Sequence, residues 1–276
     1  MFIKKKFLNN LTGKIQFDKF VRYKHTESIP KCPEPTYDTG CTFCNAPQEI
    51  EESLKNQLES IRNTIPPLNK IIVYLSNNKD NNSWPKKVET YDLMRNMSKY
   101  GRGNGNMIVL SSLSPRNPSL IGKEAGFMIF PDAKNIYINL ESQSIEQSIE
   151  QLFSNINNNA NDSLDLLNDN GNFTMEPINK IKVLICGHTN RDIRCGVMGK
   201  LVYDEFIKVL EHENLNDKID VGYVSHVGGH IYAGNVAILK PDGTTIWYGL
   251  VKPQNVQGIV EQSIKGNKII EQLSRQ

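Results

Sequence analysis

Two pairs of potential metal ligands constrain the fold of this 276-residue chain more than any other feature. Cys186 and Cys195 stand at the two ends of the segment CGHTNRDIRC, which we expect to form a loop between a strand and a helix. His226 and His230 follow in HVGGH, where the two glycines argue against a helix and favour a loop that closely approaches something bulky. The four side chains can act together only if the fold brings these two loops to one place.

The chemistry of these four residues indicates a metal site. Two thiolates and two imidazoles form a complete set of protein ligands for zinc, or for a [2Fe-2S] cluster in which two histidines replace two cysteines. Structural zinc sites commonly have two to four residues between paired cysteines, whereas eight separate Cys186 from Cys195. The spacing favours the larger two-iron cluster. Structural zinc remains an alternative, as does a buried core cysteine beside a free thiol.

Residues near the four candidates could tune them. Cys195 is expected at the beginning of a helix, where backbone amides, Arg191 and Arg194 would lower the pKa of its thiol. Asn235 and Asp192 could orient a ligand ring from outside the metal shell, and Asp192 could instead cap a turn.

A second cysteine group lies in the proline-rich segment 30–47, where Cys41 and Cys44 form a CxxC pair and Cys32 precedes Cys41 by nine positions. A CxxC pair supports dithiol–disulfide exchange when its first cysteine begins a helix and has a lowered pKa. Here no strand precedes the pair, unlike the arrangement in thioredoxin-like enzymes. Three interpretations stay open: a redox-active or labile disulfide, a metal site that includes Cys32, and structural thiols.

The first 25 residues differ in charge from the rest of the chain. They contain seven Lys or Arg residues and a single acid, Asp18. Four apolar residues share one face of the predicted helix: Phe7, Leu8, Leu11 and Ile15. A basic amphipathic segment is typical of a mitochondrial presequence and predicts the matrix or the intermembrane space, although an ordinary basic arm has the same pattern.

The remaining residues have a net charge of about −4 and so provide no positive electrostatic potential that would attract nucleic acid. Nucleic acid is therefore excluded as an expected partner. No stretch approaches the roughly 18 apolar residues of a membrane span. Five cysteines, an odd number, argue against a secreted disulfide framework.

Hydrophobic periodicity predicts an α/β protein of two units. Helices are expected over 49–64, 88–100, 144–155, 197–212 and 256–273, and strands over 70–76, 107–113, 126–131, 135–140, 180–185, 221–225, 235–239 and 245–250. The predicted division is a presequence-like segment 1–25, an α/β domain 26–160 with a Cys-rich opening, an Asn-rich linker 161–175 and a C-terminal domain 176–276.

Three segments of the C-terminal part, CGHTNRDIRCG, HVGGHIYAGNV and WYGLVKP, resemble in sequence and order the sucrase/ferredoxin-like family of fungal thioredoxin-like [2Fe-2S] ferredoxins. The resemblance is specific through Pro253, whereas the N-terminal half matches only in its length and Cys-rich opening. The family's CX8C and HX3H ligand pairs fall on Cys186 with Cys195 and on His226 with His230. His188 is not a ligand by that pattern.

We expect two thioredoxin-like domains, and the resemblance implies that the C-terminal one is a thioredoxin-like ferredoxin that carries a [2Fe-2S] cluster. It implies an electron carrier or redox regulator more than an enzyme that turns over a substrate. Its partners would be a redox protein and the iron–sulfur assembly machinery. Two alternatives remain: thiol–disulfide chemistry at Cys41 and Cys44, and a zinc-stabilised binding module in which no electron moves.

Overall fold

The computed structural model describes residues 27–55, 61–142, 144–157 and 171–276. The presequence-like segment 1–25 and most of the predicted linker lie outside these ranges. Within them, no helix combines the length and the apolar character needed to cross a membrane.

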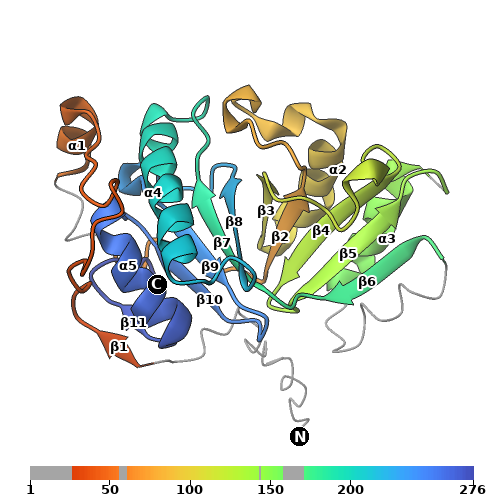
Figure 1. Cartoon of the computed structure of the whole chain (residues 1–276). Coiled ribbons are helices and arrows are strands. Elements are labelled where there is room, and N and C mark those ends of the chain that lie inside the picture. Colours follow the sequence, from red (N-terminus) through yellow and green to blue (C-terminus); the bar gives the residue numbers. More distant parts are fainter. Residues whose placement is uncertain (1–26, 56–60, 143, 158–170) are drawn as a thin grey trace, which may run out of the picture.

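A nine-stranded mixed sheet runs through both halves of the chain in the order β10-β9-β7-β8-β3-β2-β4-β5-β6 (Figure 1). Its strands are β2 (Lys70–Leu75), β3 (Asn106–Ser111), β4 (Glu124–Phe130), β5 (Lys134–Asn139), β6 (Phe173–Pro177), β7 (Ile181–Cys186), β8 (Ile219–Val224), β9 (Val236–Leu239) and β10 (Thr245–Tyr248). The pairs β2–β3 and β7–β8 are parallel, and the other neighbours are antiparallel. A mixed α/β fold is thereby confirmed.

The two halves meet where β3 pairs with β8. This junction is short: Ser111 lies opposite Val224, and the backbone N–H of Ser225 donates to the carbonyl of Leu110 at 2.7 Å. The Ser225 hydroxyl accepts a hydrogen bond from the N–H of Leu110 at 2.9 Å. Because one sheet serves both halves, the division into two thioredoxin-like domains stays a prediction.

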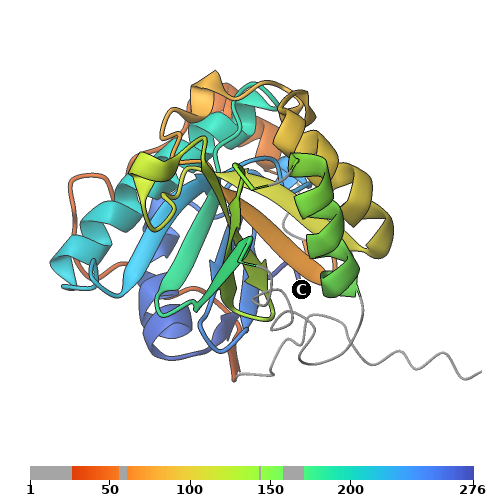
Figure 2. The ribbon, with the colours of Figure 1, turned by 90° about the vertical axis from the view of Figure 1, so that its right-hand side faces the viewer.

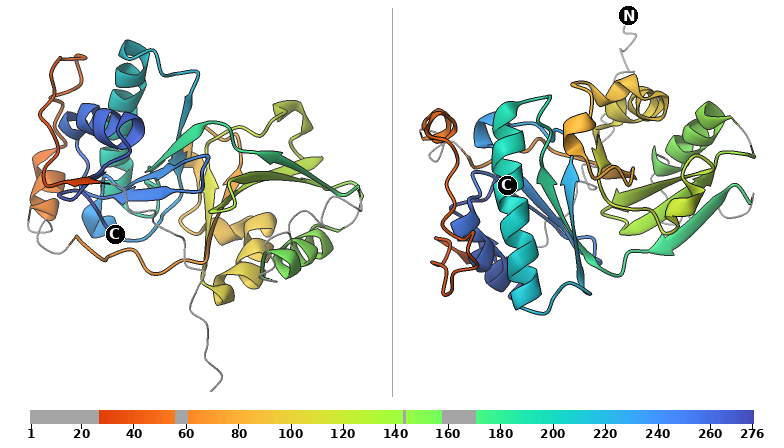
Figure 3. Two further views of the ribbon diagram at one scale, coloured as in Figure 1. Left: turned by 90° about the horizontal axis from the view of Figure 1, so that it is seen from below. Right: turned by 45° about the horizontal axis from the view of Figure 1, so that its top comes forward.

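The helices are α1 (Gln48–Leu54), α2 (Asp92–Gly101), α3 (Ile145–Asn157), α4 (Ile193–His212) and α5 (Val256–Ile259), which continues as a π-helical segment Val260–Lys265. α2 and α3 lie side by side against the N-terminal strands (Figure 2). α4 and α5 lie together beside β7, β9 and β10 (Figure 3).

Three predicted elements differ from the structure. The helix predicted over 49–64 ends at Leu54, and the N–H groups of Thr64 and Ile65 bond to the distant Arg275 carbonyl instead. The helix predicted over 256–273 ends at Lys265, because the chain then forms β11 (Ile269–Ile270) parallel to β1 (Ser28–Ile29). The predicted linker 161–175 overlaps β6, which pairs with β5. Each difference arises from partners far away in sequence.

The side chains of β7 alternate between the two faces of the sheet, and this alternation determines which core the last residue of the strand joins. Val183 and Ile185 pack in a core with α4 and α5, whereas Leu184 and Cys186 belong to a second core that extends across both halves. A third core lies between α2, α3 and the N-terminal strands. Cys186, the last residue of β7, is therefore fully buried where the two halves meet.

Candidate metal centre

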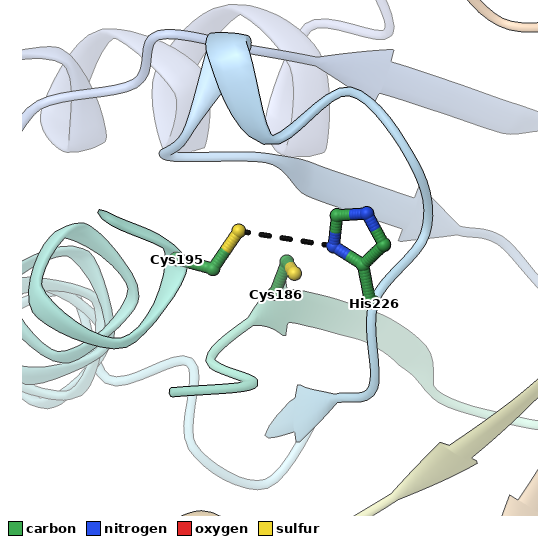
Figure 4. Close-up of side chains that lie close together, drawn as sticks. All are labelled: Cys186, Cys195 and His226. Atoms are coloured by element: carbon green, nitrogen blue, oxygen red, sulfur yellow. Dashed lines mark hydrogen bonds between the residues drawn. The ribbon is translucent and has the colours of Figure 1, made fainter. Parts of the chain in front are cut away.

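Cys186, Cys195 and His226 converge at the edge of the sheet where β7 and β8 end (Figure 4). One ligand atom from each residue lies within 4.8 Å of the other two. The Cys195 Sγ and the His226 Nδ1 are 3.9 Å apart. Both sulfurs are buried and the imidazole is half-buried, so the site has a closed thiol side and a more accessible histidine side.

The local fold explains this convergence. Since β7 and β8 are parallel, the residues that follow them meet at one edge of the sheet, as do ligand sites of many α/β proteins. Asp192 caps α4 by accepting the Arg194 N–H at 3.0 Å, which places Cys195 in the first turn. Gly199 lets α4 approach β7, because a Cβ atom there would lie 2.4 Å from the Cys186 carbonyl oxygen.

Hydrogen bonding between the two cysteines separates their acidities. The pKa of Cys186 is lowered because Cys195 and His226 donate hydrogen bonds to its sulfur, which outweighs the opposing effect of burial. The pKa of Cys195 is raised, first because it keeps the proton that it donates to Cys186 and second because it is buried. Arg194 acts in the opposite direction and lowers the pKa of Cys195, as predicted from the sequence, but its effect is smaller than these two. A metal ion would replace this shared proton.

His230 lies next to the group but outside it. It begins a short 3-10 helix, His230–Tyr232, and its ring stacks on that of His226 at a centroid distance of 5.5 Å. Its Nδ1 is 4.0 Å from an Asp192 carboxylate oxygen, and 47% of the side chain is exposed. The structure thus brings three of the four predicted ligands together and places the fourth beside them.

The loop between the two histidines is held by a buried arginine that the sequence analysis did not identify. The guanidinium of Arg275, 1% exposed, donates to the Gly228 carbonyl at 3.3 Å and to the Asn235 side chain at 2.7 Å. Asn235 in turn donates to the Gly229 carbonyl at 3.0 Å. A Cβ atom on Gly229 would lie 2.4 Å from Arg275, which explains why glycine stands there. Asn235 therefore supports the loop backbone; the structure gives it no bond to a ligand ring.

His188 positions His226 through its backbone. The ring Nδ1 of His188 accepts the His226 N–H at 3.3 Å, which leaves its Nε2–H to donate to the Pro85 carbonyl at 2.9 Å. Burial lowers the pKa of His188, in agreement with this neutral form. The sequence analysis excluded His188 as a ligand and missed this supporting role.

The N-terminal half also supports the loop that follows Cys186. The Asn81 side chain donates to the Gly187 carbonyl. The Asn190 side chain donates to the carbonyls of Asn82 and Trp84 at 2.7 and 2.8 Å. The segment 81–85 thus contacts this loop through polar bonds as well as packing.

The Cys-rich loop packs elsewhere, against α4. The fully buried carboxylate of Glu205 accepts hydrogen bonds from Thr39 at 2.5 Å and Thr42 at 2.8 Å. Cys41 and Cys44 are both free thiols, and the Cys44 N–H donates to the Cys41 carbonyl at 3.0 Å. Cys32 lies apart from this pair, and its thiol donates to the Asn255 carbonyl at 3.4 Å. Among the described residues, these three cysteines do not form a metal-binding group.

The acidity of Cys41 disfavours disulfide exchange through the CxxC pair. Burial, followed by the neighbouring Cys44, raises the pKa of the Cys41 thiol to about 11. At pH 8, roughly one molecule in a thousand would carry the reactive thiolate, against about one in ten at an ordinary pKa of 9.0. We expect the iodoacetamide labelling rate of Cys41 to rise about tenfold per pH unit between pH 8 and pH 10, measured by peptide mass spectrometry. A rate that levels off near pH 9, as in the urea-unfolded chain, would contradict this assignment.

Comparison with known proteins identifies the family of this chain. A family model described as sucrase/ferredoxin-like matches residues 61–276. The chain is similar to altered inheritance of mitochondria protein 32 from Clavispora lusitaniae, with 33% identity over 90% of this chain and 94% of that protein. Proteins of the same name from Meyerozyma guilliermondii and Debaryomyces hansenii are 30% identical over 91% of this chain and 95% of theirs, and 47% identical over 37% and 38%. The family match and these relatives show that the chain belongs to the sucrase/ferredoxin-like family.

Proposed function

We propose that this chain is a [2Fe-2S] electron-transfer or redox-regulatory protein whose cluster is held by Cys186, Cys195, His226 and His230. The observation that carries the proposal is the convergence of two sulfurs and one imidazole nitrogen within 4.8 Å at the end of two parallel strands. His230 is the fourth ligand: its ring stacks on that of His226, and among the described residues Asp192 is the one acid paired with it, at a distance of 4.0 Å.

The donor set fits such a cluster. When bound, the cluster supplies one-electron transfer, and imidazole ligands raise its potential above that of an all-cysteine cluster. The buried cysteines keep water away from the sulfur side. The His226 and His230 rings form the more exposed side, where a redox partner would approach. His188 and Arg275 fix the two ends of the histidine loop.

We also propose a mitochondrial association for this chain. The support is that its relatives are named altered inheritance of mitochondria proteins, together with the basic pattern of residues 1–25. In either the matrix or the intermembrane space, the protein would receive its cluster from the iron–sulfur assembly machinery and exchange electrons with a partner protein.

Anaerobic purification followed by metal analysis and spectroscopy tests the proposal. We expect about two irons per chain, visible absorption and a rhombic EPR signal after dithionite reduction. His226→Cys and His230→Cys should each keep iron but change the EPR signal and lower the potential, because a thiolate adds negative charge. His212→Cys, in an exposed position at the end of α4, is the matched control and should change neither.

Two results would contradict the proposal. One zinc per chain in a colourless protein would establish the zinc-stabilised binding module instead, because zinc has no redox chemistry. An iron-containing protein whose EPR signal is unchanged in both histidine variants would show that the histidines do not bind the cluster.

A further inference from the structure

A cavity of about 530 Å³ opens beside the histidine side of the metal centre. His226, His188 and Ser225 line one end of it. Among the four candidate ligands, only His226 contributes to its wall. Anything bound there would contact the edge of the metal centre without reaching the buried sulfurs.

The charged groups that face this cavity are mostly basic. Lys86, Lys87 and Arg191 line it with exposed side chains, and none of them has a carboxylate partner among the described residues. Arg102 also lines it but is paired with Glu89, which is the one acidic residue in the wall. Three uncompensated positive charges therefore surround a single opening, and they favour an anion.

The size and the remaining lining indicate the class of anion. Val88 and Ile108, which are largely buried, add apolar surface to the wall of the cavity. A volume of about 530 Å³ lies within the range of sites that hold small organic molecules. A simple inorganic ion would leave the apolar surface of Val88 and Ile108 uncovered, and the surface of another protein would not enter the cavity.

We propose that this cavity binds a small organic anion, with a carboxylate or phosphate group on the basic rim and an apolar body against Val88 and Ile108. The binding site does not depend on which metal the centre holds. If the chain is the electron-transfer protein proposed above, the molecule bound here would be a small-molecule redox partner or effector in contact with the His226 ring.

Calorimetric titration of the full-length, metal-loaded chain with phenyl phosphate tests this proposal. Phenyl phosphate should bind at least about tenfold more tightly than inorganic phosphate or phenol, because only phenyl phosphate offers both the charge and the apolar body. The triple variant Lys86→Gln, Lys87→Gln, Arg191→Gln should weaken its affinity at least about tenfold, and raising the ionic strength should weaken binding to the native chain.

Lys218→Gln is the matched control. Lys218 is also an exposed lysine, but it lies far from the cavity. Lys218 precedes β8 and His226 follows β8, so the six residues of this strand separate Lys218 from His226 by roughly 20 Å. This variant should bind phenyl phosphate as the native chain does. Histidine-ring NMR signals of a zinc-loaded sample, assigned through His188→Gln and His226→Gln, should show shifts for both rings on titration.

The proposal would be overturned if phenyl phosphate bound no more tightly than phosphate and phenol, or if the triple variant and Lys218→Gln bound it equally well. Because these titrations measure binding and not electron transfer, their failure would leave the metal analysis of the centre unaffected. A colourless zinc protein that still bound phenyl phosphate would refute the proposed function alone.

Discussion

Cys186→Ser is expected to remove the metal from the protein almost completely. The side chain is fully buried at the end of β7, and its sulfur lies within 4.8 Å of the Cys195 sulfur and of a ring nitrogen of His226. A serine hydroxyl is neither deprotonated at neutral pH nor a soft ligand, and the buried site offers no replacement thiolate. Iron should fall from about two per chain to less than about 0.2, measured by metal analysis after anaerobic purification.

Cys32→Ser provides the control for this experiment. Cys32 is partly buried, and a serine hydroxyl can keep its hydrogen bond to the Asn255 carbonyl. The iron content of this variant should equal that of the native chain. If Cys186→Ser kept its iron while a Cys41→Ser, Cys44→Ser double variant lost it, the metal would belong to the Cys-rich loop and our site would be wrong.

Arg275→Met is expected to destabilise the protein by at least about 3 kcal/mol, because it removes one buried group that several parts of the chain share. The guanidinium donates to the hydroxyl and the carbonyl of Thr64 at 3.0 and 3.1 Å, and to Gly228 and Asn235 at the histidine loop. No carboxylate in the described ranges forms an ion pair with it, and burial lowers its pKa to about 10. Urea unfolding of the native chain and the variant measures the difference.

The same variant should bind its metal about 10- to 100-fold more weakly, since the backbone that presents His226 and His230 loses its support. Arg62→Met is the matched control, because Arg62 is another arginine with a side-chain partner, the Glu271 carboxylate, but is 61% exposed. Its effect on unfolding should stay below about 1 kcal/mol. Equal effects of the two substitutions on unfolding and metal affinity would show that Arg275 has no special role in the site.

Local sequence pattern predicted most of the sheet. The strand predicted over 70–76 is β2, and the strands predicted over 126–131 and 135–140 are β4 and β5, which pair antiparallel. Such segments carry their own signal, because each is a short apolar run bounded by turn residues. The ends of α1 and α5 were missed because distant partners determine them: the Arg275 carbonyl for Thr64, and β1 for β11.

The metal centre could likewise be predicted only in part from local sequence pattern. The cysteines and histidines were predicted from residue type and spacing, and three of the four converge. His188 and Arg275 support the ligands without binding a metal, so no ligand pattern marks them. The role of Arg275 depends on contacts with residues 40 or more positions away, which a single sequence does not reveal.

The pairing of β3 with β8 has a consequence for how the metal centre is assembled. All four proposed ligands come from residues 186–230, yet the loop after Cys186 is bonded to residues 81–85, and the strand that leads to His226 completes its pairing with β3. A fragment that contained only the ligands would lack one wall of its own site. Cluster insertion would therefore have to wait until the two halves have folded against each other, so that maturation depends on the tertiary structure of both halves and not only on the four ligands.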